Sequence, residues 1–115
     1  GLAGHLKEMI GESIGVEIFK DRIPYFEEAV ELVKSGFAPG GLYSNRDFYK
    51  THVVSAAQDF FYDIIFDPQT SGGLLFAVAE EDLPLFEKNA KSLTVDYWII
   101  GKFLSEPKGK IVLSS

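Results

Sequence analysis

The sequence predicts an α/β domain of the α+β kind, in which a mixed β-sheet is packed with helices. Segments with apolar residues at helical spacing alternate along the chain with short apolar strands. A length of 115 residues is that of one domain, and 46% hydrophobic with 14% aromatic residues is enough for a packed core. No internal repeat or low-complexity tract interrupts this pattern.

The first third of the chain is expected to form a helix, a strand and a second helix. Apolar residues recur at helical spacing over residues 2–14, and Gly15 suits the left-handed conformation that stops a helix. Residues 16–19 alternate like a short strand. Pro24 suits the first position of the second helix, which Gly36 is expected to end.

The middle of the chain is expected to contain the main loop, followed by a strand, a helix and a buried strand. Proline and glycine mark residues 36–46 as the loop. Residues 52–55 predict a strand and residues 56–64 a short helix. Residues 74–79 are apolar on both faces, which is typical of a central strand.

The last segment is expected to form one helix and two strands. Acidic residues from Glu80 onward favour a helix N-terminus there. The spacing of the apolar residues turns three of them inward: Phe86, Ala90 and Leu93. Residues 95–100 and 110–113 predict the remaining strands.

Composition excludes several classes of protein. A net charge of −6 argues against a nucleic-acid binder, which needs a basic face. Apolar runs of about six residues are far shorter than the roughly 20 that span a bilayer. There is no cysteine and no signal-peptide pattern, and the first residue is not methionine. We therefore expect a cytoplasmic chain, either processed or part of a longer one, that binds neither nucleic acid nor membranes.

The most informative stretch is the polar turn Asp67-Pro68-Gln69-Thr70-Ser71-Gly72-Gly73, which runs directly into Leu74-Leu75. Proline restricts the chain at its start. Glycine is needed where a ligand or another part of the protein comes close to the backbone. The simplest interpretation is a structural turn. The alternative is that Thr70, Ser71, Gly72 and Gly73 present backbone N–H groups and two hydroxyls to a phosphate.

This string closely resembles the D-P-Q-T-S-G-G-L-L signature of the selenophosphate synthetases (selenide, water dikinases). Gly1-Leu2-Ala3-Gly4-His5 is similar to a G-L-x-G-H segment of that family, and Pro39-Gly40-Gly41 with Asn45 resembles a second glycine loop. Ile100-Gly101-Lys102-Phe103 and Lys110-Ile111-Val112 fit its closing strands. The resemblance spans nearly all 115 residues, and its specificity is concentrated in residues 67–75.

The resemblance implies the C-terminal domain of an enzyme of the AIR-synthase-like superfamily, over residues 1–115. Such enzymes use ATP, selenide and water to make selenophosphate, AMP and phosphate, with Mg²⁺ bound by aspartates. The resemblance places those aspartates, a nucleophilic Cys or selenocysteine and a lysine in an N-terminal ATP-binding half, before Gly1. It also implies a homodimer built largely by that half. We expect the isolated fragment to be a catalytically inactive monomer whose partner is the N-terminal half.

Other candidate residues have simpler interpretations. Asn45 belongs to the second glycine loop and is a weak candidate for nucleotide binding, and Arg46 could pair with phosphate but is more simply solvated. Three aspartates recur every four residues and could hold a cation, although a polar helix face explains them better: Asp59, Asp63 and Asp67. His5 is of interest only through the resemblance, and His52 has no assigned role.

Two alternatives to this enzyme stay open. The parent could be another AIR-synthase-like enzyme, of the hydrogenase-maturation or thiamine-phosphate kinase type, although Gln69-Thr70-Ser71 speaks against it. The chain could also be a free-standing, non-catalytic binding or assembly module. Its acidic balance and the absence of a reactive side-chain cluster in the sequence suit that interpretation.

Overall fold

The computed structural model describes residues 1–115 and contains a four-stranded mixed sheet with five α-helices. The strands are β1 (Gly15–Phe19), β2 (Val53–Ser55), β3 (Gly101–Leu104) and β4 (Ile111–Ser114). The helices are α1 (Leu2–Ile10), α2 (Glu27–Lys34), α3 (Gly40–Tyr49), α4 (Phe60–Ile64) and α5 (Leu83–Ser92). This architecture confirms the predicted fold class.

The sheet has the order β2-β4-β1-β3, with β4 parallel to both of its neighbours and β3 antiparallel to β1. In β1, Val16 and Ile18 point to the buried face and are paired with Ile111 and Leu113 of β4. Glu17 lies on the opposite face, where the Lys102 ammonium is 3.3 Å from its carboxylate. The sheet therefore has one apolar face and one open face, as mixed and antiparallel sheets permit.

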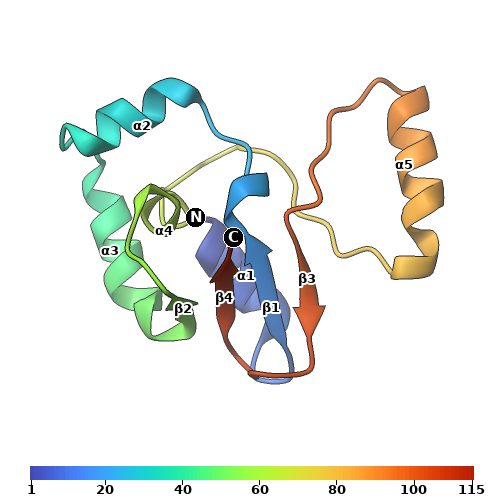
Figure 1. The fold of residues 1–115 in the computed structure, drawn as a ribbon, viewed down its shortest axis with the longest axis horizontal. Helices are drawn as coiled ribbons and strands as arrows, with labels where there is room; N and C mark the ends of the chain where they lie inside the picture. The colour runs from blue at the N-terminus through green and yellow to red at the C-terminus, as the bar shows by residue number, and fades with distance from the viewer.

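Helix α1 covers the apolar face of the sheet (Figure 1). Three of its residues follow the predicted helical spacing and are almost completely buried: Ala3, Leu6 and Ile10. The helix ends earlier than predicted, because Gly11 adopts the positive φ of 54° that Gly15 was expected to adopt. Gly15 instead begins β1, where a Cβ would overlap the carbonyl oxygen of Pro107.

Helices α2, α3 and α4 lie together beyond the β2 edge of the sheet (Figure 1). Helix α2 begins at Glu27, three residues after the predicted start at Pro24, and ends before Gly36, whose φ is 84°. Helix α3 replaces most of the loop predicted over residues 36–46, so that prediction was wrong. The apolar residue Leu42 buries the helix against the core, although Pro39-Gly40-Gly41 is typical of a loop.

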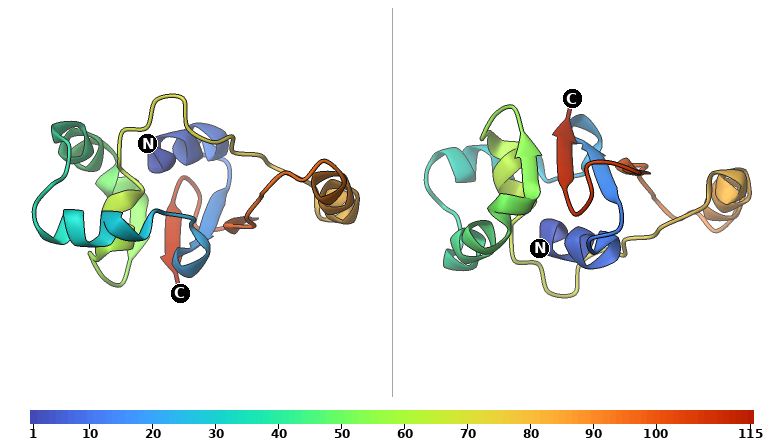
Figure 2. Two further views of the ribbon diagram at one scale, coloured as in Figure 1. Left: turned by 90° about the horizontal axis from the view of Figure 1, so that it is seen from above. Right: turned by 90° about the horizontal axis from the view of Figure 1, so that it is seen from below.

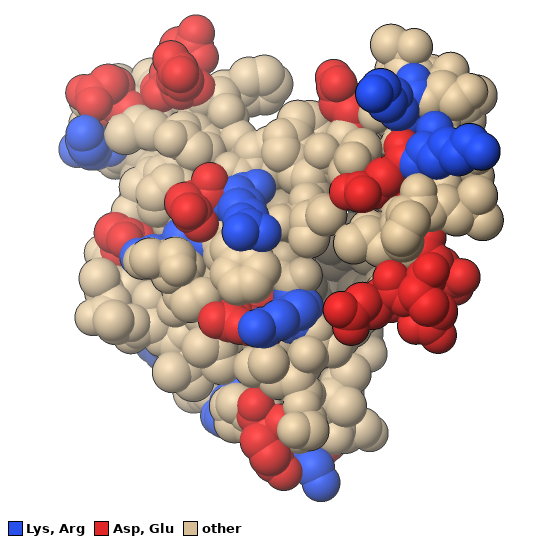
Figure 3. Space-filling model, turned by 45° about the vertical axis from the view of Figure 1, so that its right-hand side comes forward, with Lys and Arg blue, Asp and Glu red and all other residues tan.

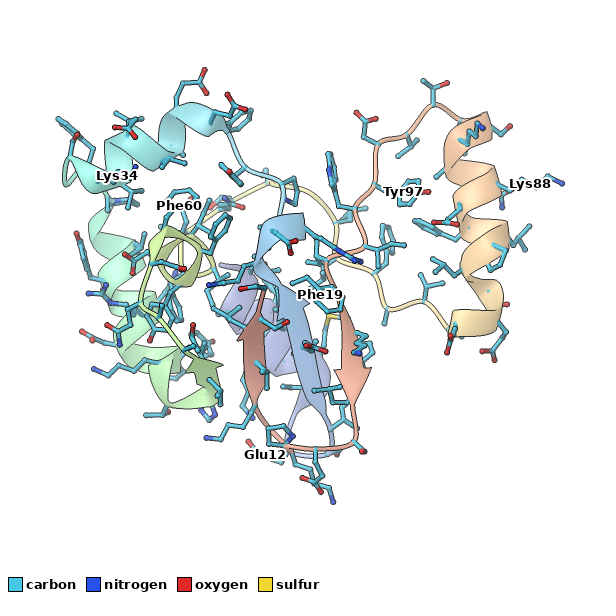
Figure 4. All side chains as sticks on the ribbon, in the orientation of Figure 1. Glu12, Phe19, Lys34, Phe60, Lys88 and Tyr97 are labelled. Atoms are coloured by element: carbon cyan, nitrogen blue, oxygen red, sulfur yellow. The ribbon has the colours of Figure 1, made fainter.

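Residues 74–100 form an arm that consists of an extended segment, the short 3₁₀ helix η3 (Glu80–Asp82), α5 and a second extended segment. The arm projects from the β3 side of the body in all three views (Figures 1 and 2). Figure 4 shows Tyr97 pointing from the second segment toward α5, and Lys88 on the side of α5 that faces away from this segment. The rings of Phe86 and Tyr97 are 5.5 Å apart, so α5 is held mainly by the arm's own aromatic residues.

The arm differs from the prediction in two respects. Residues 74–79 are not a central strand, since Leu74 is 83% exposed and Phe76 is 62% exposed. The reason is that a strand apolar on both faces needs a layer on each side, and the chain provides only α5. The last strands are Gly101–Leu104 and Ile111–Ser114, so the strand predicted over residues 95–100 is displaced. Ala90 faces inward as predicted, but Leu93 is 74% exposed.

None of the helices combines the length and the apolar character needed to cross a membrane. The face of the molecule that carries α5 shows acidic and basic side chains interspersed, with broad uncharged areas between them (Figure 3). This face has no continuous basic surface of the kind that neutralises phosphates along a nucleic acid.

Candidate functional site

The motifs lie on three segments: the start of α1, the start of α3 and the polar turn after α4. These segments meet at residues 65–68, which we call the loop root. From the α1 side, the Ala3 N–H donates to the carbonyl of Ile65 at 2.8 Å. A Cβ on Gly1 would lie only 2.8 Å from the carbonyl oxygen of Asp67, so glycine permits this close approach. Figure 2 shows the chain after α4 passing beside the N-terminus of α1.

Helix α3 contacts the loop root from the other side. The amide nitrogen Nδ2 of Asn45 donates to the carbonyl oxygen of Phe66 at 2.9 Å. A Cβ on Gly41 would lie 3.0 Å from Cγ of Pro68, so the start of α3 packs closely on the proline ring. The half-buried Asn45 side chain is therefore engaged with the protein's own backbone at the entrance to the loop.

Residues 69–73, which we call the glycine loop, follow the root and are exposed. The Gln69 amide donates to the Asp67 carboxylate at 3.2 Å, and Ser71 has a positive φ of 59°. None of the backbone N–H groups of residues 69–73 donates a hydrogen bond within the chain. The loop therefore presents free N–H donors and the hydroxyls of Thr70 and Ser71, which are groups that can bind an anion.

The glycines of this loop have no explanation within the chain. Neither Gly72 nor Gly73 has a positive φ. A Cβ on Gly73 would meet nothing within 4 Å, and one on Gly72 would only touch the Gln69 side chain at 3.7 Å or more. An L-residue at either position would therefore fit this structure without strain, so the turn by itself does not require glycine.

The three aspartates considered as a cation site are held by different partners. Asp59 is the N-cap of α4, where its carboxylate accepts from the Tyr62 N–H at 3.1 Å and from Lys20 Nζ at 2.9 Å. Burial acts to raise the pKa of Asp59, but these two hydrogen bonds outweigh it and leave the pKa below its ordinary value. Asp63 pairs with Arg46 instead, and Asp67 accepts from the Gln69 amide.

Arg46 lies on α3 and is not a solvated loop residue, so the simpler expectation for it was wrong. Its guanidinium is 2.9 Å from the Asp63 carboxylate and lies over the ring of Tyr43, 5.1 Å from the centroid. Both side chains of the ion pair are about one-third exposed or less. The pair joins α3 to α4 and so helps to place the loop root between them.

The histidines and the acidic residues do not assemble a metal centre. His5 is exposed, and its Nδ1 lies 3.5 Å from the Glu8 carboxylate on the same helix. No group of three or more His, Cys, Asp or Glu side chains could hold a metal ion. The Mg²⁺ that the resemblance implies therefore has no such ligand cluster among these residues.

One residue of the site was not singled out by its sequence. Phe66 has no exposed surface, and its buried backbone carbonyl accepts the hydrogen bond from Asn45 of α3. In the sequence it is only one more apolar residue before Asp67-Pro68. Because the contact is made by the backbone, side-chain identity gives no signal for it.

The fold and the site define a class of protein: an α+β domain whose mixed sheet carries an exposed, glycine-containing loop fixed at its root by two helices. The chain belongs to the family described as AIR synthase related protein, C-terminal domain, whose model matches residues 1–114.

Several relatives of the chain share the name "Selenide, water dikinase". The protein of Pelobacter propionicus is 39% identical over 117 residues, covering 98% of this chain and 34% of the relative. That of Caldanaerobacter subterraneus subsp. tengcongensis is 42% identical over 105 residues, covering 89% and 30%. That of Campylobacter jejuni is 33% identical over 114 residues, covering 99% and 33%. The chain thus spans about a third of the length of the curated relatives it matches.

Proposed function

We propose that the chain is the C-terminal third of a selenophosphate synthetase, which makes selenophosphate from selenide, ATP and water and releases AMP and phosphate. The observation that carries this proposal is the 39% identity to a selenide, water dikinase over 98% of the chain, which includes the uninterrupted string of residues 67–75. The fold class and the matched family agree with it.

In this proposal the reacting groups belong to the N-terminal part of the enzyme. The nucleophilic Cys or selenocysteine, the lysine and the Mg²⁺-binding aspartates implied by the resemblance have no counterpart among these 115 residues, which include no cysteine. ATP and Mg²⁺ are then held mainly by that part. We expect the 115 residues alone not to turn over ATP.

The contribution of this chain is to close the nucleotide site with the glycine loop. Gly72 and Gly73 have no intrachain reason to be glycine, so the close backbone approach that glycine permits comes from outside the chain. Free N–H groups of residues 69–73 suit phosphate oxygens. Such donors bind phosphate oxygens without a charged side chain.

The arm provides the surface for the N-terminal part. Large apolar side chains on both extended segments are exposed, among them Leu74, Phe76, Val95 and Trp98. Exposed apolar surface of this extent is unfavourable in water and is typical of an interface. We propose that the N-terminal ATP-binding half covers the arm in a cytoplasmic homodimer built largely by that half.

A chimera tests the activity. The C-terminal third of the Pelobacter propionicus relative is replaced by this chain, and AMP, phosphate and selenophosphate are followed by chromatography and ³¹P NMR. Selenide-dependent formation of AMP and selenophosphate is expected from the chimera and not from the 115 residues alone. A folded chimera that makes neither product, beside an active unmodified relative, would overturn the proposal.

A pair of glycine variants tests the loop. We expect Gly73→Ala to leave the unfolding midpoint of the 115-residue chain unchanged or slightly higher, because alanine restricts the unfolded chain. The same change in the chimera is expected to lower kcat/KM for ATP at least tenfold. Gly36→Ala, at a position with φ of 84°, is the matched control and should lower stability instead. Unchanged kcat/KM in the Gly73 variant would remove the loop from the nucleotide site.

A further inference from the structure

The carbonyl of Phe66 is a buried polar group with a single partner. Phe66 has no exposed surface, so water does not reach its carbonyl oxygen. The Asn45 amide donates the one hydrogen bond that this oxygen accepts, at 2.9 Å. A buried carbonyl without a partner is strongly unfavourable, and the position of Phe66 therefore depends on the side chain of Asn45.

Phe66 lies at the point where the chain changes from fixed to free. Before it, the loop root is held by the backbone bonds from Ala3 N–H to Ile65 and from Asp67 N–H to Ile64, at 2.8 and 3.1 Å. After Pro68, no backbone group of residues 69–78 is paired within the chain. The direction in which the glycine loop leaves the body is thus set by the last residues of the root.

Asn45 reaches this point from a rigid element. It is the sixth of the ten residues of α3, and the neighbouring Arg46 binds Asp63 of α4 at 2.9 Å. Helix α3 also packs against Pro68 through Gly41. An amide placed on such a helix fixes the carbonyl in both distance and direction, which an apolar contact does not do.

We propose that Asn45 is a positioning residue for nucleotide binding: its amide fixes the loop root through the Phe66 carbonyl and so aims the N–H groups of residues 69–73 at the phosphates of ATP. This role deepens the proposed function and depends on it for the identity of the ligand. In this role Asn45 acts on the ligand through the loop root, because one N–H of its amide is engaged by the Phe66 carbonyl. Loss of this amide loosens the root, and the loop then samples orientations in which its donors miss the phosphates.

Three variants separate this role from a general structural one. Asn45→Asp keeps the size of the side chain but places an oxygen against the Phe66 carbonyl, and Asn45→Gln restores a donor on a longer arm. Gln58→Glu makes the same amide-to-carboxylate change at an exposed position outside the arm and the loop root. Each variant is made in the 115-residue chain and in the chimera.

The first readout is amide hydrogen exchange of the 115-residue chain, which does not depend on any enzyme activity. In Asn45→Asp the amides of Ala3 and Asp67 are expected to exchange about tenfold faster, while the amide of Val16 in the sheet keeps its wild-type rate. Asn45→Gln should recover part of the protection. Equal acceleration of the sheet amide, or no acceleration at the root, would overturn the positioning role.

The second readout is the steady-state kinetics of the chimera. In Asn45→Asp the KM for ATP is expected to rise about tenfold with a smaller change in kcat, since the loop's donors bind ground state and transition state alike. Gln58→Glu should keep both constants. A loosened root with an unchanged KM for ATP would overturn the role in nucleotide binding while leaving the family activity intact, whereas an inactive wild-type chimera would contradict the proposed function itself.

Discussion

The N-cap of α4 offers a test of how the site's supporting helix is held. The Asp59 carboxylate caps the helix through the Tyr62 N–H at 3.1 Å and also pairs with Lys20 at 2.9 Å. Asp59→Ala removes both interactions, and Asp59→Asn removes only the ion pair, because asparagine is as good an N-cap as aspartate. The two variants therefore divide the stabilisation into its parts.

The expected magnitudes follow from the two interactions. Loss of an N-cap costs typically ~1 kcal/mol. The ion pair contributes less, roughly 0.2–1 kcal/mol, because the Asp59 side chain is 38% exposed. Asp59→Ala should thus lower the free energy of unfolding by about 1–2 kcal/mol and Asp59→Asn by at most about 1 kcal/mol. The free energy of unfolding falls with urea by about 2 kcal/mol per M. The urea midpoint should therefore fall by about 0.5–1 M in Asp59→Ala and by at most about 0.5 M in Asp59→Asn.

The pH dependence has a defined sign. The pKa of Asp59 is lowered on folding from its ordinary value of 3.8, so the ionised carboxylate stabilises the folded chain. This contribution is complete above the ordinary pKa and is lost as the pH falls through the lowered pKa of the folded state. The difference between the wild type and Asp59→Asn should therefore be largest at pH 6 and shrink as the pH falls below the ordinary pKa of 3.8.

The assay is urea unfolding followed by circular dichroism at pH 6, 4 and 2.5. Asp96→Asn serves as the control, because Asp96 is exposed and makes no ion pair. An Asp59→Asn variant as unstable as Asp59→Ala would refute the separation of cap from ion pair. A difference from wild type that persists unchanged at pH 2.5 would refute the electrostatic origin of the effect.

Two further predictions concern the sheet and the arm. Gly101→Val should abolish the β1–β3 pairing, because a Cβ would overlap the carbonyl oxygen of Glu17 in the neighbouring strand. The loss is measured as faster hydrogen exchange of the β3 amides, and retained protection would contradict this prediction. Trp98 is 57% exposed, so acrylamide should quench its fluorescence efficiently in the 115-residue chain. In the chimera the quenching should be several-fold weaker, measured against the Trp98→Phe chimera as background. Equal quenching would mean that the arm stays uncovered.

The elements that the sequence predicted correctly are those whose pattern is local. The helix from Leu2, the strand Gly15–Phe19 and the final strand each bury one face, and the period of the apolar residues shows which face that is. The strand Val53–Ser55 was also predicted, although it is only partly buried. Helix α3 was missed because its first turn is Pro39-Gly40-Gly41, and its stabilisation comes from distant partners on α4 and the loop root.

The arm was not predicted because an apolar pattern on both faces indicates a strand between two layers. Leu74 and Phe76 have the composition of a central strand, but no second layer exists here to cover them. The string of residues 67–75 carried the resemblance to the family, which the comparisons confirm, whereas its role as a binding site stays a prediction. The convergence of this segment with Gly1 and Asn45 could not be predicted, since those contacts reach backbone carbonyls that are 21 or more residues away in the sequence.

The position of β4 in the sheet has a consequence for biosynthesis. This strand comprises residues 111–114, yet it lies in the interior of the sheet between β1 and β2. A ribosome releases β1 and β2 long before β4, so during synthesis the two have no strand to join them, and α1 has only half of its apolar platform. The sheet can close only when the last strand emerges. A stalled or truncated chain would therefore expose Val16 and Ile18, making it a substrate for chaperones or proteases.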